Sequence, residues 1–366
     1  VIDDAAADFT NSGGYLSLYI QDLQTGDTLT RDPDIAFAGM SLIKIPILLE
    51  TYRVLDGEPN SYHTQLITQT AALSGNYTAN LLLGLISGDD DPYNGTDALT
   101  NAMRRLNLYN TFIAAPYDSI PREGRPLTFL TPANTRLDIN TNPDPNMQTT
   151  TRDLGQLLSW IYACATAQPS PLDDYAAGLT TADCEDLLQM MTLNNIDSLL
   201  EAGIPESVPL AHKHGWIGDT HGDAGIVFSP QGAYTIVVIL HRPGWLEWDE
   251  SSPLIAEISR LAYAHFNSAS PYPAEMVLPA QTAVPPTPTS DLPRAIVNGT
   301  AGIGLRLRTT PAGEEIEILP EGSVVLLLDD IPTDINGVAW RHVRSVLGSE
   351  GWVGADYLIT DFLQQN

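Results

Sequence analysis

The sequence predicts an α/β protein of the α+β type. In its main domain, both chain ends form one antiparallel sheet, and a helical lobe is inserted between them. Alternating apolar residues predict strands at 15–30 and 223–242, whereas residues 64–165 carry apolar residues at helical spacing. Beyond residue 293, short β-rich runs between Gly and Pro turns predict a small C-terminal β-barrel.

The first elements are a hairpin and a helix. Residues 15–30 alternate apolar and polar side chains around a Thr-Gly-Asp turn, as two paired strands do. Residues 41–55 have apolar side chains at helical spacing, and Pro46 lies near the start, where a missing N–H costs least. We therefore expect a helix to begin at Ser41.

The later elements return from helices to strands. Helical segments separated by polar loops fill residues 64–165, and Thr180 with Asp183 forms a capping pair that opens a further helix. Two strands follow within 223–242, and the apolar spacing of residues 253–266 predicts a closing helix.

A change of composition marks the domain boundaries. Residues 271–293 are rich in Pro, Thr and Ala and lack periodicity, which is typical of an extended linker. We expect a main domain at 1–270, this linker, and a small barrel at 294–366. A chain of 366 residues is long enough for both domains.

The composition excludes several classes of partner. A net charge of -28 repels phosphate backbones and anionic membranes, so we expect no nucleic-acid partner. No apolar run reaches the ~18 to 20 residues of a membrane-spanning helix, so we expect no transmembrane segment. The two cysteines, Cys164 and Cys184, leave a single disulfide and a pair of buried thiols equally open.

Lysine is the rarest charged residue. Only Lys44 and Lys213 occur among the 17 basic residues. Arginine replaces lysine easily on a solvated surface, but it does not lose its proton. Both lysines are therefore candidates for chemistry that needs an amine.

Ser41 and Lys44 are three residues apart at a predicted helix start, which places both side chains on one face. A serine hydroxyl is a weak nucleophile until a base removes its proton, and a lysine with a lowered pKa is such a base. By itself this spacing is weak evidence, since a helix-opening serine beside a snorkelling lysine gives the same pattern.

Two further segments give this pair a context. Ser74 and Asn76 stand at the start of another predicted helix, and Lys213 and Gly215 lie just before a predicted strand. The order serine-x-x-lysine, serine-x-asparagine, lysine-x-glycine resembles the class A β-lactamases and the related penicillin-binding serine peptidases. The resemblance covers residues 1–268 and implies their fold and acyl-transfer chemistry.

By this resemblance, Ser41 attacks the substrate carbonyl and is acylated while Lys44 takes its proton. Ser74 passes a proton to the leaving nitrogen, and Asn76 orients Lys44 and the substrate amide. Lys213 supplies positive charge for a substrate carboxylate and, by like-charge repulsion, helps keep Lys44 deprotonated.

The segment after Lys213 completes the implied substrate site. Gly215 lets the strand approach the ligand closely. The N–H of Trp216, with that of Ser41, forms the oxyanion hole. His214 stands where the family has threonine or serine; its imidazole is expected to hydrogen-bond a carboxylate and to be able to add a charge at mildly acidic pH.

Two departures concern the helical lobe and deacylation. Ser74 follows Ser41 by only 33 residues, so part of the lobe is missing and the cleft is expected to be more open. The family's water-activating loop glutamate has no counterpart in residues 135–154. Asp138 and Asn140 are the nearest substitutes, although Asp138 is also interpretable as a solvated or turn-capping residue. Acylation is expected to be faster than deacylation.

A metal site was the alternative for one segment. His212, His214, His221 and Asp223 lie close in sequence. The resemblance, however, implies that Lys213 and Gly215 lie on a substrate-facing strand edge, where alternation sends His212 and His214 to the same face and leaves His221 beyond a turn. We therefore expect no metal and no cofactor.

The C-terminal segment resembles bacterial Src-homology-three-like domains, chiefly in the sequence GWVGADYL. Trp340, Trp352 and Tyr357 either line a groove for peptide or fill the barrel core. With the linker, this resemblance predicts an extracellular or cell-envelope location and peptidoglycan as a partner of the barrel.

The sequence thus predicts a serine hydrolase that forms an acyl-enzyme with β-lactams or peptidoglycan-like cell-wall peptides. An esterase or other small-amide hydrolase on the same scaffold is the first alternative. A catalytically idle protein that binds cell-wall peptide is the second.

Overall fold

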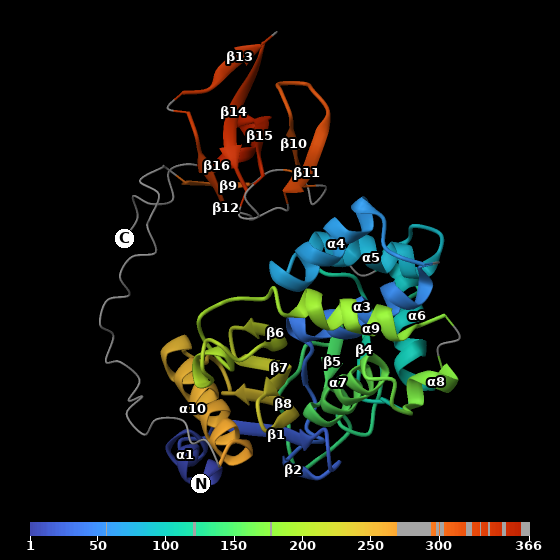
Figure 1. Cartoon of the computed structure of the whole chain (residues 1–366), viewed down its shortest axis with the longest axis vertical. Helices are drawn as coiled ribbons and strands as arrows, with labels where there is room; N and C mark the ends of the chain where they lie inside the picture. Colours follow the sequence, from blue (N-terminus) through green and yellow to red (C-terminus); the bar gives the residue numbers. More distant parts are fainter. Residues whose placement is uncertain are drawn as a thin grey trace. The chain divides into compact units, whose positions relative to one another are not determined.

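The computed structural model describes most of two compact units, Val1–Ser74 with Ala79–Ala274, and Gly75–Thr78 with Glu275–Asn366 (Figure 1). The described residues are 1–268 except 56, 120–121 and 176–177, and 294–359 except 298–299, 301–303, 320–323, 330, 336 and 346–348. The predicted linker at 271–293 lies outside the described residues.

The first unit contains a five-stranded antiparallel sheet with the order β2-β1-β8-β7-β6. Its strands are β1 (Tyr15–Asp22), β2 (Thr28–Arg31), β6 (Leu210–Ile217), β7 (Thr220–Ser229) and β8 (Gly232–His241). Strand β1 pairs along its whole length with β8, from Tyr15 opposite His241 to Asp22 opposite Tyr234. The predicted sheet made from both chain ends is confirmed.

Helices fill the sequence between the two groups of strands and also flank them. They are α1 (Ile2–Ala5), α2 (Ala7–Asn11), α3 (Lys44–Val54), α4 (Ser61–Ala72), α5 (Asn76–Ser87), α6 (Pro92–Arg105), α7 (Thr151–Ala165), α8 (Pro171–Tyr175), α9 (Thr181–Met191) and α10 (Trp248–Phe266). A small sheet with the order β3-β5-β4 joins β3 (Phe37–Ala38), β5 (Met147–Thr149) and β4 (Phe112–Ile113). The Thr180–Asp183 capping box that opens α9 is confirmed.

The main sheet separates two hydrophobic cores. Leu16, Leu18 and Ile20 of β1 pack with residues of α10 on one face. Tyr19 points to the other face, where a Cβ on Gly155 of α7 would lie 2.1 Å from its ring. The period-2 alternation of β1 thus places α10 and α7 on opposite faces, as Figure 1 shows.

The expectation that a regular helix begins at Ser41 is wrong by one turn. Met40–Ile43 forms a 3₁₀ turn (η1), and the α-helix begins at Lys44. Met40 enters this turn with a φ of 49°, a conformation that is strained for a side chain of its size.

The described part of the second unit is a strongly curled antiparallel sheet with the order β11-β10-β15-β14-β12-β9-β16 and β13 paired to β14. The strands are β9 (Arg294–Val297), β10 (Leu305–Arg308), β11 (Glu315–Leu319), β12 (Val324–Leu327), β13 (Thr333–Ile335), β14 (Val338–Arg344), β15 (Glu350–Gly354) and β16 (Leu358–Ile359). Small aliphatic side chains such as Val325, Val343 and Val353 form its core. The predicted fold class is confirmed for both units.

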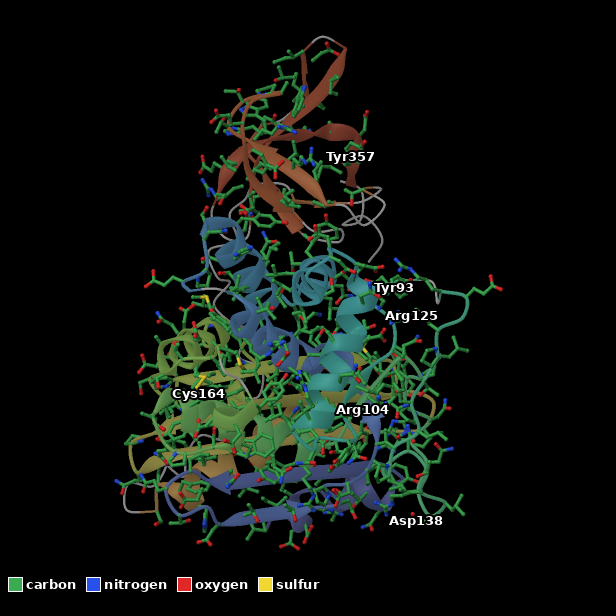
Figure 2. The ribbon with its side chains drawn as sticks, turned by 90° about the vertical axis from the view of Figure 1, so that its right-hand side faces the viewer. Tyr93, Arg104, Arg125, Asp138, Cys164 and Tyr357 are labelled. Atoms are coloured by element: carbon green, nitrogen blue, oxygen red, sulfur yellow. A yellow bond between two sulfur atoms is a disulfide. The ribbon has the colours of Figure 1, made fainter. Side chains whose placement is uncertain are left out.

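Cys164 of α7 and Cys184 of α9 form a disulfide, visible in Figure 2 at the Cys164 label. The bond decides between the two states that the sequence left open. Within the described residues, no helix is long and apolar enough to cross a bilayer.

Replacing both cysteines by alanine is expected to lower the free energy of unfolding by about 3 kcal/mol, because the bridge closes a loop of 20 residues in the unfolded chain. Urea unfolding of the variant and of the oxidised protein measures the difference. Reduced wild-type protein is the control and should match the variant; equal midpoints for all three samples would contradict this account.

Candidate active site

Ser41 and Lys44 are in direct contact. The Nζ atom of Lys44 donates a hydrogen bond of 2.8 Å to the Oγ atom of Ser41. In a 3₁₀ turn the side chains at positions i and i+3 eclipse one another, so the Met40–Ile43 turn brings this pair together more directly than an α-helix does. The local backbone therefore presents a hydroxyl to an amine.

A second serine, Ser74, also accepts hydrogen bonds from the Lys44 amine. Nζ donates to the carbonyl oxygen of Ser74 at 2.9 Å and to its Oγ atom at 3.3 Å. Ser74 has a φ of 58°, and Asn76 opens α5 two residues later. The Ser74 predicted from the serine-x-asparagine segment thus lies against the amine of Lys44.

The pKa of Lys44 lies well below its usual value. Burial is the largest cause, since Lys44 is fully buried, and the positive charge of Lys213 lowers it further. Asp118 acts in the opposite direction. A neutral amine is therefore favoured beside the Ser41 hydroxyl, as a general base requires.

Lys213 is the second buried amine. Burial lowers its pKa to about 7, although Asp223 opposes the shift. Its Nζ atom donates to the carbonyl oxygen of His214 at 3.1 Å. The charge of Lys213 thus lowers the pKa of Lys44, as expected from the sequence.

The side chains of strand β6 point alternately to its two faces. Lys213 and Gly215 alternate with His212, His214 and Trp216. A Cβ atom on Gly215 would lie 2.7 Å from the backbone nitrogen of Ser41. Only glycine lets the strand lie against the 3₁₀ turn, and this contact brings the Ser41 N–H close to the end of β6.

His214 lies on the strand face away from Ser41. Its ring stacks on Trp216, with centroids 5.0 Å apart, and no described residue hydrogen-bonds its Nδ1 atom. Burial and then Lys213 lower its pKa to about 3. The ring is neutral at mildly acidic pH, so the expectation that His214 adds a charge there is wrong.

The other members of the histidine segment bond to nearby groups. His212 and Asp223 form a buried ion pair, with His212 Nδ1 at 2.9 Å from Oδ1 and 3.0 Å from Oδ2. Burial lowers the pKa of His212, but Asp223 more than offsets this and the net shift is upward. His221 Nδ1 bonds to Ser251 Oγ at 2.6 Å. Across the described residues, no group of His, Cys, Asp or Glu side chains is arranged to hold a metal ion.

The two loop residues considered for deacylation lie at the surface. Asp138 is exposed and binds Arg136 through both carboxylate oxygens, and Figure 2 shows it at the edge of the molecule. Arg136 lowers the pKa of Asp138. Asn140 accepts a hydrogen bond from the backbone of Asn142 within a turn. These surroundings are those of a solvated pair and a turn residue.

Tyr117 is a further residue of the site, and no sequence motif indicates it. Lys44 Nζ lies 4.3 Å from the centre of the Tyr117 ring, and the Tyr117 hydroxyl donates to the Met40 carbonyl at 2.8 Å. Asn80 of α5 bonds to both the N–H and the carbonyl of Tyr117, each at 2.9 Å. A loop far from every motif therefore covers the Lys44 amine, and no periodicity or spacing indicated it.

This geometry agrees with the comparison of the sequence with protein families. The family model described as the beta-lactamase enzyme family matches residues 2–63 and 54–266. The chain belongs to this family. Comparison with curated proteins gives no match.

Solved structures of similar fold include class A enzymes and a penicillin-binding protein. A PBP-A mutant in an acyl-enzyme complex with penicillin G is 21% identical, with a TM-score of 0.54 over 73% of this chain and 96% of that one. A beta-lactamase from Sphaerobacter thermophilus is 19% identical, with a TM-score of 0.54 over 74% and 98%. One from Streptosporangium roseum is 16% identical, with a TM-score of 0.53 over 73% and 97%. These similarities show the beta-lactamase-like fold.

Binding of carboxylate-bearing substrates is expected to weaken as the pH rises through about 7, because Lys213 is charged below its pKa of about 7 and neutral above it. KM measured from pH 5.5 to 8.5 should rise for a substrate with a carboxylate and stay flat for a neutral ester. In Lys213→Arg the charge is fixed, so the rise should disappear. A flat KM for both substrates in the wild type would remove Lys213 from this role.

Proposed function

We propose that this family member is a serine hydrolase that forms an acyl-enzyme on Ser41 with β-lactams or peptidoglycan-like amides. The observation that carries the proposal is the hydrogen bond between Ser41 Oγ and the buried Lys44 amine, whose pKa is lowered. An activated hydroxyl needs a base that is neutral at working pH, and burial beside Lys213 favours that state.

The proposed acylation uses the groups that surround the pair. Lys44 takes the proton of Ser41 as Oγ bonds to the substrate carbonyl carbon. The N–H groups of Ser41 and Trp216 stabilise the oxyanion. The C–N bond then breaks as the leaving nitrogen receives a proton from the Ser74 hydroxyl, which is restored by Lys44; the 3.3 Å contact between Lys44 and Ser74 supports this transfer.

The remaining site residues recognise the substrate in this proposal. The Lys213 ammonium attracts a carboxylate, and Asn76 orients the amide. Gly215 keeps the strand edge close to Ser41. His214 acts indirectly in this proposal. Its ring stacks on Trp216, on the strand face opposite Lys213 and Gly215, and so holds the Trp216 side chain in place.

We also propose that the protein works outside the cytoplasm and that its C-terminal unit is an Src-homology-three-like module that binds peptidoglycan. The Cys164–Cys184 bond supports an oxidising compartment. Tyr357 is exposed, and Trp352 stacks on His342 with centroids 4.9 Å apart, which supports a partly open aromatic surface.

Ser41→Ala is expected to abolish covalent labelling by penicillin and by activated esters, because no other hydroxyl accepts a hydrogen bond from Lys44 in the same turn. Intact mass after exposure to each reagent measures the adduct, and circular dichroism checks the fold. Labelling by esters but not by penicillin would favour the esterase alternative, and a wild type without any adduct would favour an idle binding protein. Undiminished labelling of the variant would remove Ser41 as the nucleophile.

Lys44→Arg is expected to lower the acylation rate by about 100-fold or more, since arginine keeps its proton and a positioned general base contributes about that factor. Stopped-flow acylation measures the rate. Lys213→Arg is the comparison variant and should chiefly raise KM for carboxylate-bearing substrates. Near wild-type acylation by Lys44→Arg would place the base elsewhere.

A further inference from the structure

A hollow in the surface of the first unit lies where α7 passes the hairpin of β1 and β2, two elements that Figure 1 shows side by side with the helix. Its volume is about 250 Å³, just below the ~300 Å³ at which pockets for drug-sized ligands begin, so it suits a ligand of one or two rings. Its described lining residues include none of those assigned to the candidate active site.

Contacts within the fold hold the walls of this hollow in place. Gly155 of α7 has no side chain, so the Tyr19 ring of β1 packs directly against the helix. Beyond the strand, Asp22 Oδ1 accepts hydrogen bonds from the N–H groups of Gln24 at 2.8 Å and Thr25 at 3.2 Å. Helix and hairpin turn are therefore fixed before a ligand arrives, which lowers the entropic cost of binding.

Aromatic side chains form the apolar part of the lining. Tyr19 is buried, whereas Trp160 and Tyr162 are half-buried and line the hollow with part of their surface exposed. The Tyr162 ring also packs on Phe228, with centroids 6.4 Å apart. Such side chains combine a flat apolar surface with a polar N–H or O–H group, which matches a sugar ring with its C–H face and its hydroxyl edge.

The polar part of the lining consists of groups that are available for hydrogen bonding. Gln21 Oε1 accepts bonds from the hydroxyls of Tyr19 at 2.8 Å and Ser159 at 2.7 Å. Both lone pairs of this oxygen are then used, and the Nε2 group remains as a donor. In the part of the chain that the structure describes, the lining groups without a hydrogen-bond partner are Gln21 Nε2 and the side chains of Gln156, Trp160, Tyr162 and Gln168.

Charge is nearly absent from this lining. Asp22 is the single charged side chain among the described lining residues, and it already bonds to two N–H groups of its own turn. An anionic ligand would meet no counter-charge here and a chain of net charge -28. A metal ion would meet only one carboxylate, fewer ligands than such ions require. The lining therefore favours a neutral ligand with many hydroxyl groups.

We propose that this hollow is a binding site for a neutral saccharide, separate from the Ser41 site. The face of one sugar ring packs on Trp160 and Tyr162, and its hydroxyls bond to the amides of Gln21 and Gln156. The site uses no acyl-enzyme chemistry, so it stands independently of the proposed function.

Calorimetric titration of the full chain with an N-acetylglucosamine trimer and with maltotriose tests the site. At least one of these neutral sugars should bind the wild type. Trp160→Ala should weaken that binding by about 10-fold or more, the effect of truncating an aromatic anchor. Gln156→Ala should weaken it by about 3-fold or more, because it removes a hydrogen-bonding group while alanine favours the helix. Circular dichroism checks the fold, and if Trp160→Ala does not fold, Gln156→Ala decides the question.

Trp245→Ala is the matched control, since Trp245 is exposed and is not among the described lining residues. It should bind the sugar as the wild type does, and so should Ser41→Ala. Loss of binding only in Ser41→Ala would place the sugar in the active site, and loss only in Trp352→Ala would place it on the C-terminal unit. Either result, unchanged binding by the folded hollow variants, or no binding of either sugar by the wild type would overturn the proposed saccharide site. Penicillin labelling of Ser41 tests the proposed function separately and should be the same in wild type and Gln156→Ala.

Discussion

The active site depends on the burial of two lysine amines. Lys44 and Lys213 are both fully buried, and desolvation disfavours the charged form of each. The positive charge of Lys213 also lowers the pKa of Lys44. On a solvated surface Lys44 would remain protonated and its hydrogen bond to Ser41 would activate nothing. The helical lobe and the main sheet therefore do two things for Lys44 and Lys213: they fix the positions of the two amines, and they provide the apolar surroundings that lower their pKa values.

Strand β6 carries residues of the candidate site on one face and a buried ion pair on the other. Its Lys213 and Gly215 face the 3₁₀ turn, whereas His212 on the opposite face is paired with Asp223 and donates a hydrogen bond from Nε2 to the carbonyl oxygen of Asn194. Loss of either partner leaves an uncompensated buried charge. The buried His212–Asp223 ion pair thus stabilises one face of β6. On the other face, the absence of a side chain at Gly215 lets the strand approach Ser41.

The site is closed by a segment with no motif of its own. Tyr117 bonds to Met40 and to Asn80, so it links the Ser41 turn to α5. This link covers one side of the Lys44 amine. Ser41, Ser74 and Tyr117 are therefore brought around the Lys44 amine by contacts among three chain segments that are distant in sequence.

The sequence by itself determined strands β1, β2, β7 and β8 of the main sheet, the capping box of α9 and the spacing of Ser41 and Lys44, because each depends on local periodicity or on residues a few positions apart. It also indicated Ser74 and Lys213 through their order. Only the tertiary structure decided the Cys164–Cys184 bond, the 3₁₀ form of the Ser41 turn and the neutral state of His214. It likewise placed Asp138 at the surface, bound to Arg136. Burial and the approach of distant loops set these features, and neither is encoded in the spacing of neighbouring residues.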